Sequence, residues 1–289
     1  ANLLRGYPET QVTLTLYRSS EKKEYTHTLT RRIILVNTVE YEPLENQIGY
    51  LKISSFSKLT EKQLKKYLKQ AKLEGVTGFI LDLRGNPGGL LNQSVKVASH
   101  FLFKGQMVVY TQGRSKDDYR EYRSLYKESL HKMPLVVLIN QYSASASEIV
   151  AGALRESGNA LLIGENSYGK GSVQTIFRIS DGSGVRLTTS KYFTPAGADI
   201  TKNGIVPEIK IINDLIKEEE STVTKKSSNS DTLLSLKASS LKKFFEKQGL
   251  NKKHDATVEL ARRILKNSHT ASKKRSMEKA REIAASINY

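Results

Sequence analysis

The chain has 289 residues and a formal net charge of +17 at pH 7, with 38% hydrophobic and 26% charged residues. This length can bury a sizeable core in one to three domains, and no apolar run approaches the roughly 18 residues that a membrane span requires. The sequence contains no cysteine, which excludes thiol catalysis, zinc ribbons and disulfides.

The positive charge makes a nucleic acid or an anionic membrane surface worth considering as a partner. Lysine and arginine are spread along the chain, however, and no basic segment is interleaved with stacking aromatic residues. Nucleic-acid binding is therefore not expected to be the main function. A membrane surface stays open as a partner, but the sequence does not support it further.

The first 36 residues have the pattern of β-strands. Apolar and polar residues alternate from Val12 to Leu16, and they alternate again from Tyr25 to Leu29 after a charged turn. This arrangement predicts a hairpin. The segment is too short to bury a core by itself.

Residues 47–171 alternate between strand and helix patterns, which predicts a largely parallel sheet covered on both faces. Strands are expected at 48–54, 78–83, 134–139 and 160–163, and helices at 61–74, 90–101 and 146–156. Strands at 173–179 and 185–193 then form a predicted hairpin. Residues 213–230 are polar and are expected to be a linker, followed by helical patterns at about 231–248, 255–267 and 273–287.

A run of small residues from Ser143 to Ser147 lies where a predicted strand turns into a helix. A serine at such a turn presents its hydroxyl at the end of the sheet. For Ser145, the next amide, that of Ala146, points from a helix N-terminus and can stabilise a developing oxyanion. Taken alone, the run more often marks a small-residue turn in which Ser145 or Ser147 caps the helix.

A catalytic serine needs a base, and the five histidines lie outside the glycine-rich turns. A lysine can serve if burial lowers its pKa toward neutrality. Lys170 is the candidate, because it sits between Gly169 and Gly171 just after an apolar strand. The alternatives are an exposed loop lysine and a phosphate loop beginning at Gly164. Gly171 stands where a phosphate loop needs a hydroxyl residue for magnesium, which disfavours an NTPase.

A glycine-rich loop at 84–89 follows another predicted buried strand and can offer backbone N–H groups to an oxyanion. Asp82, which precedes this loop, is expected to be a structural charge partner of Arg84 rather than a catalyst. Histidine, aspartate and glutamate do not cluster at metal-ligand spacing, so no metal or cofactor is expected.

Five stretches in this order resemble the tail-specific, or carboxyl-terminal processing, protease family. They are residues 49–53, 81–90, 143–149, 164–171 and 204–207. The resemblance covers about residues 1–212 and implies an α/β fold with a crotonase/ClpP-like protease core of stacked β-α units. The implied domains are the C-terminal part of a PDZ domain at 1–36, the Ser-Lys protease core at 37–212, a linker at 213–230 and a helical C-terminal region at 231–289.

The resemblance implies a role for five residues. Ser145 is implied to be the nucleophile and Lys170 its general base, with Gln174 orienting the lysine. The backbone N–H groups of Ala146 and Gly88 are implied to form the oxyanion hole. Some members of the family carry an aspartate eleven residues after the serine. Glutamate stands at that position here, so no role is carried over to it.

The implied function is a serine endopeptidase that cleaves polypeptides near their C-termini, in the periplasm or another extracytoplasmic compartment. The helical patterns at 231–289 resemble the dimerising C-terminal regions of some members, which leaves a homodimer open, with a basic amphipathic helix that contacts a membrane surface as the alternative. The carboxylate-binding loop of a PDZ domain is missing, so the chain is expected to be a fragment of a longer protein, with a short β extension of the core as the alternative. A catalytically inactive relative that serves as a peptide-binding or scaffold protein also stays open.

Overall fold

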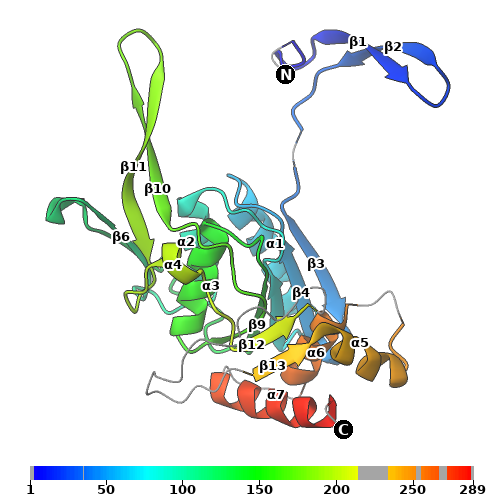
Figure 1. The fold of residues 1–289 in the computed structure, drawn as a ribbon, viewed down its shortest axis with the longest axis vertical. Helices are drawn as coiled ribbons and strands as arrows, with labels where there is room; N and C mark the ends of the chain where they lie inside the picture. The colour runs from blue at the N-terminus through cyan, green and yellow to red at the C-terminus, as the bar shows by residue number, and fades with distance from the viewer. Residues whose placement is uncertain (1–2, 35, 214–233, 252–254, 267–271, 288–289) are drawn as a thin grey trace. The chain divides into compact units, whose positions relative to one another are not determined.

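The computed structural model describes the chain except for residues 1–2, 35, 214–233, 252–254, 267–271 and 288–289 (Figure 1). Almost all of the predicted linker at 213–230 therefore lies outside the described residues. The chain forms two compact units, Ala1–Asn37 and Thr38–Tyr289, and each is described by itself.

The first unit contains an antiparallel hairpin of β1 (Gln11–Arg18) and β2 (Lys23–Thr30). One face of this hairpin carries the opposed pair Val12 and Leu29, and the other face carries opposed threonines such as Thr13 and Thr28. The predicted hairpin is confirmed. Its assignment to a PDZ domain stays a prediction.

The second unit is built on a seven-stranded sheet with the order β13-β12-β9-β8-β5-β4-β3 (Figure 1). All neighbouring strands run parallel except the edge strand β3, which is antiparallel to β4. The strands are β3 (Val39–Leu44), β4 (Ile48–Ile53), β5 (Gly78–Asp82), β8 (Leu135–Ile139), β9 (Ala160–Gly164), β12 (Ile209–Ile212) and β13 (Leu234–Lys237). The predicted α/β fold with a largely parallel sheet is confirmed.

Helices cover both faces of this sheet. Because side chains alternate along a strand, Leu81 of β5 packs into one hydrophobic cluster and Ile80 into the other. The helices of the first cluster are α1 (Thr60–Leu73), α2 (Leu91–Ser99) and α3 (Ala146–Glu156), and those of the second are α5 (Ala238–Lys247), α6 (Ala256–Leu265) and α7 (Lys273–Ile287).

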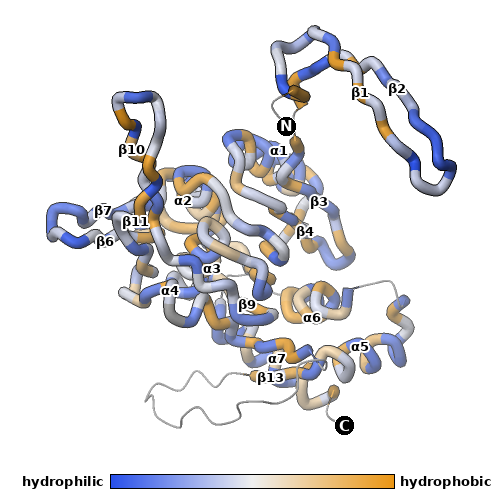
Figure 2. The backbone as a smooth tube through the Cα atoms, turned by 45° about the horizontal axis from the view of Figure 1, so that its top comes forward, coloured by the Kyte–Doolittle hydropathy of each residue, from blue (hydrophilic) through white to orange (hydrophobic). Residues whose placement is uncertain are grey.

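The C-terminal helices thus belong to the same compact unit as the seven-stranded sheet, although the sequence suggested a separate region. Their apolar residues Phe245, Leu260 and Ala280 are buried against the sheet. In Figure 2 the hydrophobic residues of α6 stand out in orange. Among the helices that are described, none is both long and apolar enough to cross a membrane.

A second, antiparallel sheet has the order β10-β11-β6-β7. Its strands are β6 (Met107–Gly113), β7 (Arg120–Arg123), β10 (Ser172–Arg178) and β11 (Gly184–Phe193). Strands β10 and β11 form the predicted hairpin and extend as a long arm (Figure 1). The short helix α4 (Ile200–Asn203) follows β11.

Candidate active site

Ser145 lies at the sharp turn between β8 and α3, at the carboxyl edge of the parallel strands. Its backbone has φ 53° and ψ −111°, a region that costs a non-glycine residue on the order of 1–3 kcal/mol. Strained residues of this kind cluster at functional sites. The backbone N–H of Ala146, the first residue of α3, has no acceptor within the described residues, as is usual at a helix N-terminus.

The glycine-rich loop after β5 lies directly against this turn. The Ala144 N–H donates to the Asn86 carbonyl at 3.0 Å, and the Ser147 hydroxyl donates to the same carbonyl at 2.9 Å. A Cβ atom on Gly88 would come within 2.7 Å of the Ala144 oxygen and 2.9 Å of the Ser145 Cβ. Only glycine therefore fits beside the serine.

Gly88 is engaged within its own loop. Its N–H donates to Asn86 Oδ1 at 2.8 Å, and the fully buried Asn86 donates from Nδ2 to the Ile53 carbonyl at 2.7 Å. Of the two N–H groups that the sequence suggests for an oxyanion hole, that of Ala146 is available in this structure and that of Gly88 is bonded to Asn86.

Lys170 lies in the loop after β9, and its side chain is exposed. The sequence suggested a buried lysine, so the structure differs from that expectation. Lys170 lines a pocket of about 590 Å³ whose other residues come from both glycine-rich loops and the serine turn: Gly85, Pro87, Tyr142, Ala144 and Tyr168. The candidate base therefore faces the same depression as the turn that carries Ser145.

Gln174 lies on β10 and its side chain is exposed. Its amide Nε2 donates to Thr188 Oγ1 on β11 at 2.6 Å. Within the described residues no hydrogen bond joins Gln174 to Lys170, or Lys170 to Ser145. The structure brings the serine turn and the lysine loop together but leaves these side chains apart.

The sequence analysis did not single out Glu148, which connects the two loops. Its fully buried carboxylate accepts the N–H groups of Ser145 at 2.7 Å and Lys170 at 2.9 Å, both on Oε2. Its other oxygen, Oε1, accepts the Ser167 hydroxyl and the Gly169 N–H, each at 2.6 Å. These four donors compensate the cost of burying the charge. The spacing from Ser145 to Glu148 is the Ser-x-x-Glu capping-box pattern, a signal that could have found this residue.

The remaining family stretch, at 204–207, is tied to the same cluster. The Ile205 N–H donates to the Ser167 hydroxyl at 2.6 Å, and the Ser167 N–H donates back to the Ile205 carbonyl at 3.1 Å. A Cβ on Gly204 would come within 2.5 Å of the Ser167 carbonyl oxygen. Three stretches that are distant in the sequence, at 143–149, 164–171 and 204–207, thus meet around Glu148 and its partner Ser167.

Glu156 lies at the other end of α3. Its carboxylate accepts the Ala196 N–H at 2.7 Å. Eleven residues of helix span about 16 Å, so Glu156 is too far from Ser145 to contact its hydroxyl. Its role in this structure is to hold the loop after β11.

Arg84 opens the glycine-rich loop and is held by carboxylates on two sides. Its Nε donates to both oxygens of Asp82 at 3.0 Å, which confirms the predicted pairing, and its Nη1 lies 2.7 Å from Asp255 Oδ2 at the start of α6. Burial lowers the pKa of Arg84, but Asp82 and Asp255 outweigh burial and raise that pKa above its ordinary value. Tyr50 donates its hydroxyl to Asp82 at 2.8 Å, and burial together with that carboxylate raises the pKa of Tyr50.

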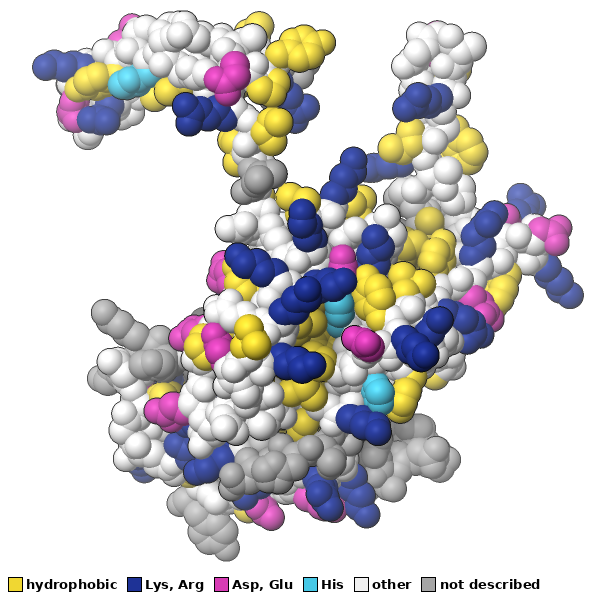
Figure 3. All heavy atoms as spheres, turned by 180° about the vertical axis from the view of Figure 1, so that it is seen from behind, with side chains coloured by type: hydrophobic (Ala, Val, Ile, Leu, Met, Phe, Trp, Pro, Cys, Tyr) yellow, Lys and Arg dark blue, Asp and Glu magenta, His cyan; other side chains and the backbone are white. Residues whose placement is uncertain are grey.

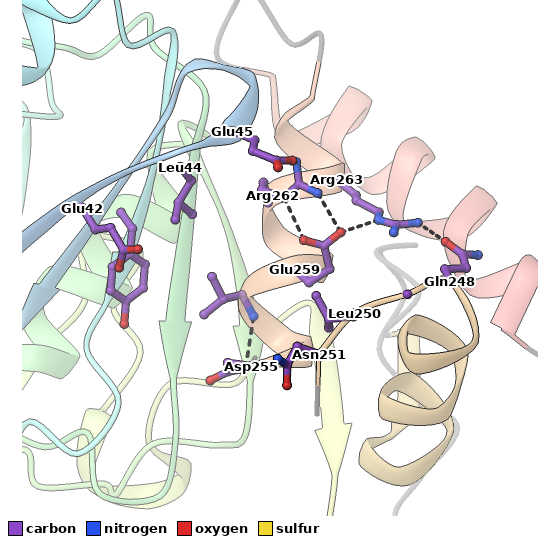
Figure 4. Close-up of a pocket in the computed structure, with 13 residues that line it drawn as sticks. Glu42, Leu44, Glu45, Gln248, Leu250, Asn251, Asp255, Glu259, Arg262 and Arg263 are labelled. Carbon is purple, nitrogen blue, oxygen red and sulfur yellow. Dashed lines mark hydrogen bonds and ion pairs between the residues drawn. The ribbon is translucent and has the colours of Figure 1, made fainter. Parts of the chain in front are cut away.

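A second pocket, of about 710 Å³, lies between β3 and the helices α5 and α6 (Figure 4). Four of the charged residues in it are paired with one another, because Glu259 accepts from Arg262 and Arg263, and Arg262 also pairs with Glu45. Burial raises the pKa of Glu259, but the two guanidinium groups outweigh burial and lower it. None of the predicted catalytic residues lines this pocket. In the described part of the chain, no group of three or more potential metal ligands is placed to bind a metal ion.

Residues 47–211 match peptidase family S41. The chain is 42% identical over 212 residues to the carboxy-terminal-processing protease of Bartonella bacilliformis, which covers 72% of this chain and 48% of that protein. It is also 42% identical over 208 residues to the carboxy-terminal processing protease CtpA of Bacillus subtilis, covering 72% and 44%. A solved structure of a photosystem II D1 C-terminal processing protease matches with 33% identity and a TM-score of 0.55, covering 71% of this chain and 56% of that one.

The chain therefore belongs to peptidase family S41, and the family resemblance found in the sequence is confirmed. It spans about half the length of the curated relatives it matches. The family match covers most of the seven-stranded sheet together with the serine turn and the lysine loop.

Proposed function

We propose that this chain is the catalytic part of a serine endopeptidase that cleaves polypeptides near their C-termini, with Ser145 as nucleophile and Lys170 as general base. The observation that carries the proposal is the pair of hydrogen bonds by which one oxygen of Glu148 accepts the backbone N–H groups of both residues. Membership of family S41 and the relatives' names support the reaction class.

In the proposed reaction, the neutral amine of Lys170 takes the proton from the Ser145 hydroxyl as that oxygen attacks the scissile carbonyl. The Ala146 N–H at the positive end of α3 stabilises the oxyanion of the tetrahedral intermediate. The Lys170 ammonium then gives its proton to the departing amine, which leaves an acyl ester on Ser145. Water, activated by the same lysine, hydrolyses this ester and restores the serine.

A bound polypeptide completes the site. Lys170 and the exposed rings of Tyr142 and Tyr168 line one pocket, so a substrate lying there covers the lysine and excludes water from it. The loss of hydration favours the neutral amine, which is the form that a base requires. Binding of the substrate and activation of the base are therefore one event in this mechanism.

The roles proposed for Gln174 and Gly88 each require one hydrogen bond to change. Gln174 orients Lys170 only after its amide leaves Thr188, and a register shift between Val173 and Gln174 lies at that point of the hairpin. Bulges of this kind re-aim side chains beside active sites. Gly88 becomes the second oxyanion donor when its N–H turns away from Asn86.

The substrates proposed are polypeptide tails, because the relatives are named for carboxy-terminal processing. A PDZ domain formed in part by the first unit, an extracytoplasmic location and a homodimer through the helical region are carried only by the family resemblance. An inactive relative that binds peptides is the second candidate, favoured by the exposure of Lys170 and the engagement of Gln174 by Thr188.

The test is proteolysis of an unfolded protein with a nonpolar C-terminus by the unmutated chain and by Ser145→Ala and Lys170→Ala. We expect cleavage by the unmutated chain alone, with all three proteins giving the same circular-dichroism spectrum. Cleavage that survives Lys170→Ala would refute the Ser-Lys assignment. Binding of the tail without cleavage by the unmutated chain would favour the inactive relative.

A further inference from the structure

The outer face of α1 consists of lysines. The opposite face buries Leu64, Leu68 and Ala71 in the core. At 100° per residue the lysines fall within an arc of about 120° on the solvent side, and no acidic residue lies within that arc. All five lysines of the helix are exposed: Lys62, Lys65, Lys66, Lys69 and Lys72.

The carboxylates near this face are used elsewhere. Glu61 accepts from the Tyr126 hydroxyl at 3.0 Å, and Glu74 accepts from the Gln70 amide at 2.8 Å. Across the described residues none of the five lysines forms an ion pair with a carboxylate, and the ammonium of Lys66 lies 5.6 Å from the ring centre of Tyr67 on the same helix. Lysines three and four residues apart repel one another, so this face destabilises the helix unless an anionic surface lies against it.

An exposed apolar residue adjoins the lysines. Leu73, the last residue of α1, falls within the same arc and is 89% exposed. On a bilayer, a protruding leucine can enter the headgroup region while neighbouring lysines contact anionic lipids. On the face of the molecule seen in Figure 3, Lys and Arg side chains also predominate over Asp and Glu.

We propose that the lysine face of α1 is a docking surface for an anionic lipid bilayer. The charged side chains of this face are all lysines, and a lysine ammonium is a point charge suited to a diffuse anionic surface. The face has neither the arginine forks nor the stacking aromatic groove with which proteins hold nucleic acids. None of the predicted catalytic residues lies on α1, so this inference does not rest on the proposed function.

The test compares two triple variants that remove the same charge from different places. Lys62→Gln/Lys66→Gln/Lys69→Gln removes three lysines from the α1 face. The matched control removes three exposed lysines of α5, namely Lys242→Gln, Lys243→Gln and Lys247→Gln. Lysine and glutamine have similar helix propensities, so both variants are expected to fold.

Sedimentation with vesicles of phosphatidylcholine, with and without an equal part of phosphatidylserine, gives the readout. We expect the unmutated chain and the α5 control to bind the anionic vesicles only, and salt to weaken this binding. The α1 variant should bind more weakly by on the order of a hundredfold at low salt, since each lysine near an anionic surface contributes to affinity.

Three results would overturn the proposal. Equal losses in the two triple variants would mean that net charge alone drives binding. Equal binding to neutral vesicles would remove the role of the lysines. Binding to single-stranded DNA without binding to anionic vesicles would assign the surface to nucleic acid. Leu73→Ser, which keeps every charge, should weaken vesicle binding by a smaller factor.

Discussion

Ser145 and Lys170, 25 residues apart in the chain, donate their backbone N–H groups to a single oxygen of Glu148. Their two nitrogens therefore cannot be farther apart than two hydrogen-bond lengths combined. The buried carboxylate of Glu148 holds the two loops together. Moving either loop alone would leave a buried charge or N–H donor without a partner, which costs free energy. The distance between the candidate nucleophile and the candidate base is thus set by the backbone before any side chain turns.

Glu148→Gln should destabilise the protein and abolish proteolysis. The amide group of glutamine would face N–H donors, leaving at least one buried donor unsatisfied at a cost of about 1–3 kcal/mol in the free energy of unfolding. Urea unfolding measures this loss, and the proteolysis assay measures the activity. Unchanged stability in Glu148→Gln would show that these four hydrogen bonds do not hold the loops together.

Gly88→Ala should reduce proteolysis strongly. Gly88 has φ +99°, and an added Cβ would meet the Ala144 oxygen at 2.7 Å and disturb the serine turn. Gly75→Ala is the matched control, because Gly75 also has positive φ at +71° and open space around its Cβ direction, and it does not line the pocket beside Lys170. Both variants carry the strain of positive φ, about 1–2 kcal/mol, so a difference in kcat/KM between them isolates the contact. Equal activities in the two variants would contradict this account.

Asp255 should make two separable contributions to stability. Its carboxylate pairs with Arg84, and it also caps α6 by accepting the N–H groups of Thr257 and Val258. Asparagine keeps the cap and removes the charge, so Asp255→Asn should cost only a few tenths of a kcal/mol to about 1 kcal/mol for a partly exposed ion pair. Asp255→Ala should cost about 1 kcal/mol more, because it also removes the cap.

Urea unfolding of the two Asp255 variants checks this separation. Equal destabilisation by alanine and asparagine would mean that the cap contributes nothing. The proteolysis assay adds an independent measurement, because loss of the Arg84 pair loosens the loop beside Ser145. We expect Asp255→Asn to lower kcat more than it changes KM.

His100 should make the protein less stable at mildly acid pH. Burial lowers the pKa of His100 below 6.5, and the nearby charge of Lys65 lowers it further, although the hydrogen bond that His100 makes to the Glu61 carboxylate opposes this shift. The unfolded chain therefore takes up a proton near pH 6.5 while folded His100 stays neutral to lower pH. The unfolded state binds more protons in this interval, so the free energy of unfolding falls as the pH drops through 6.5.

Urea unfolding tests this effect at several pH values between about 5 and 8, the range in which a histidine titrates. His100→Gln should remove part of the decline that the unmutated chain shows on acidification. His27→Gln, at an exposed position of β2, should leave the decline unchanged. The same decline in all three proteins would assign it to other groups.

Some elements could be predicted from the sequence because they carry their own pattern. The continuous apolar run of β5 and the amphipathic helix α1 are examples. The sequence pattern does not predict the edge strand β3, because this segment carries Glu40, Glu42 and Pro43. It forms a strand by pairing with β4. Strand β13 has only four residues and is defined by its register with β12.

Part of the candidate site could also be predicted from the sequence, and part could not. Ser145 and Lys170 lie in glycine and serine motifs that are visible in the sequence. The link through Glu148 and the bond from Gln174 to Thr188 depend on segments that meet only in the folded chain. Local spacing indicates which residues carry chemistry, and tertiary contacts decide which of their hydrogen-bonding groups are already occupied.

Because α5, α6 and α7 cover one face of the sheet, the order of synthesis affects when that face can be buried. The family match ends at residue 211, yet Ile80, Val136 and Ile163 are buried by helices that begin only at residue 238. While the chain is being synthesised, one side of the strands remains bare until these last helices leave the ribosome. The sequence family ends before the folding unit does, and a chain cut at the family boundary would expose an apolar surface prone to aggregation.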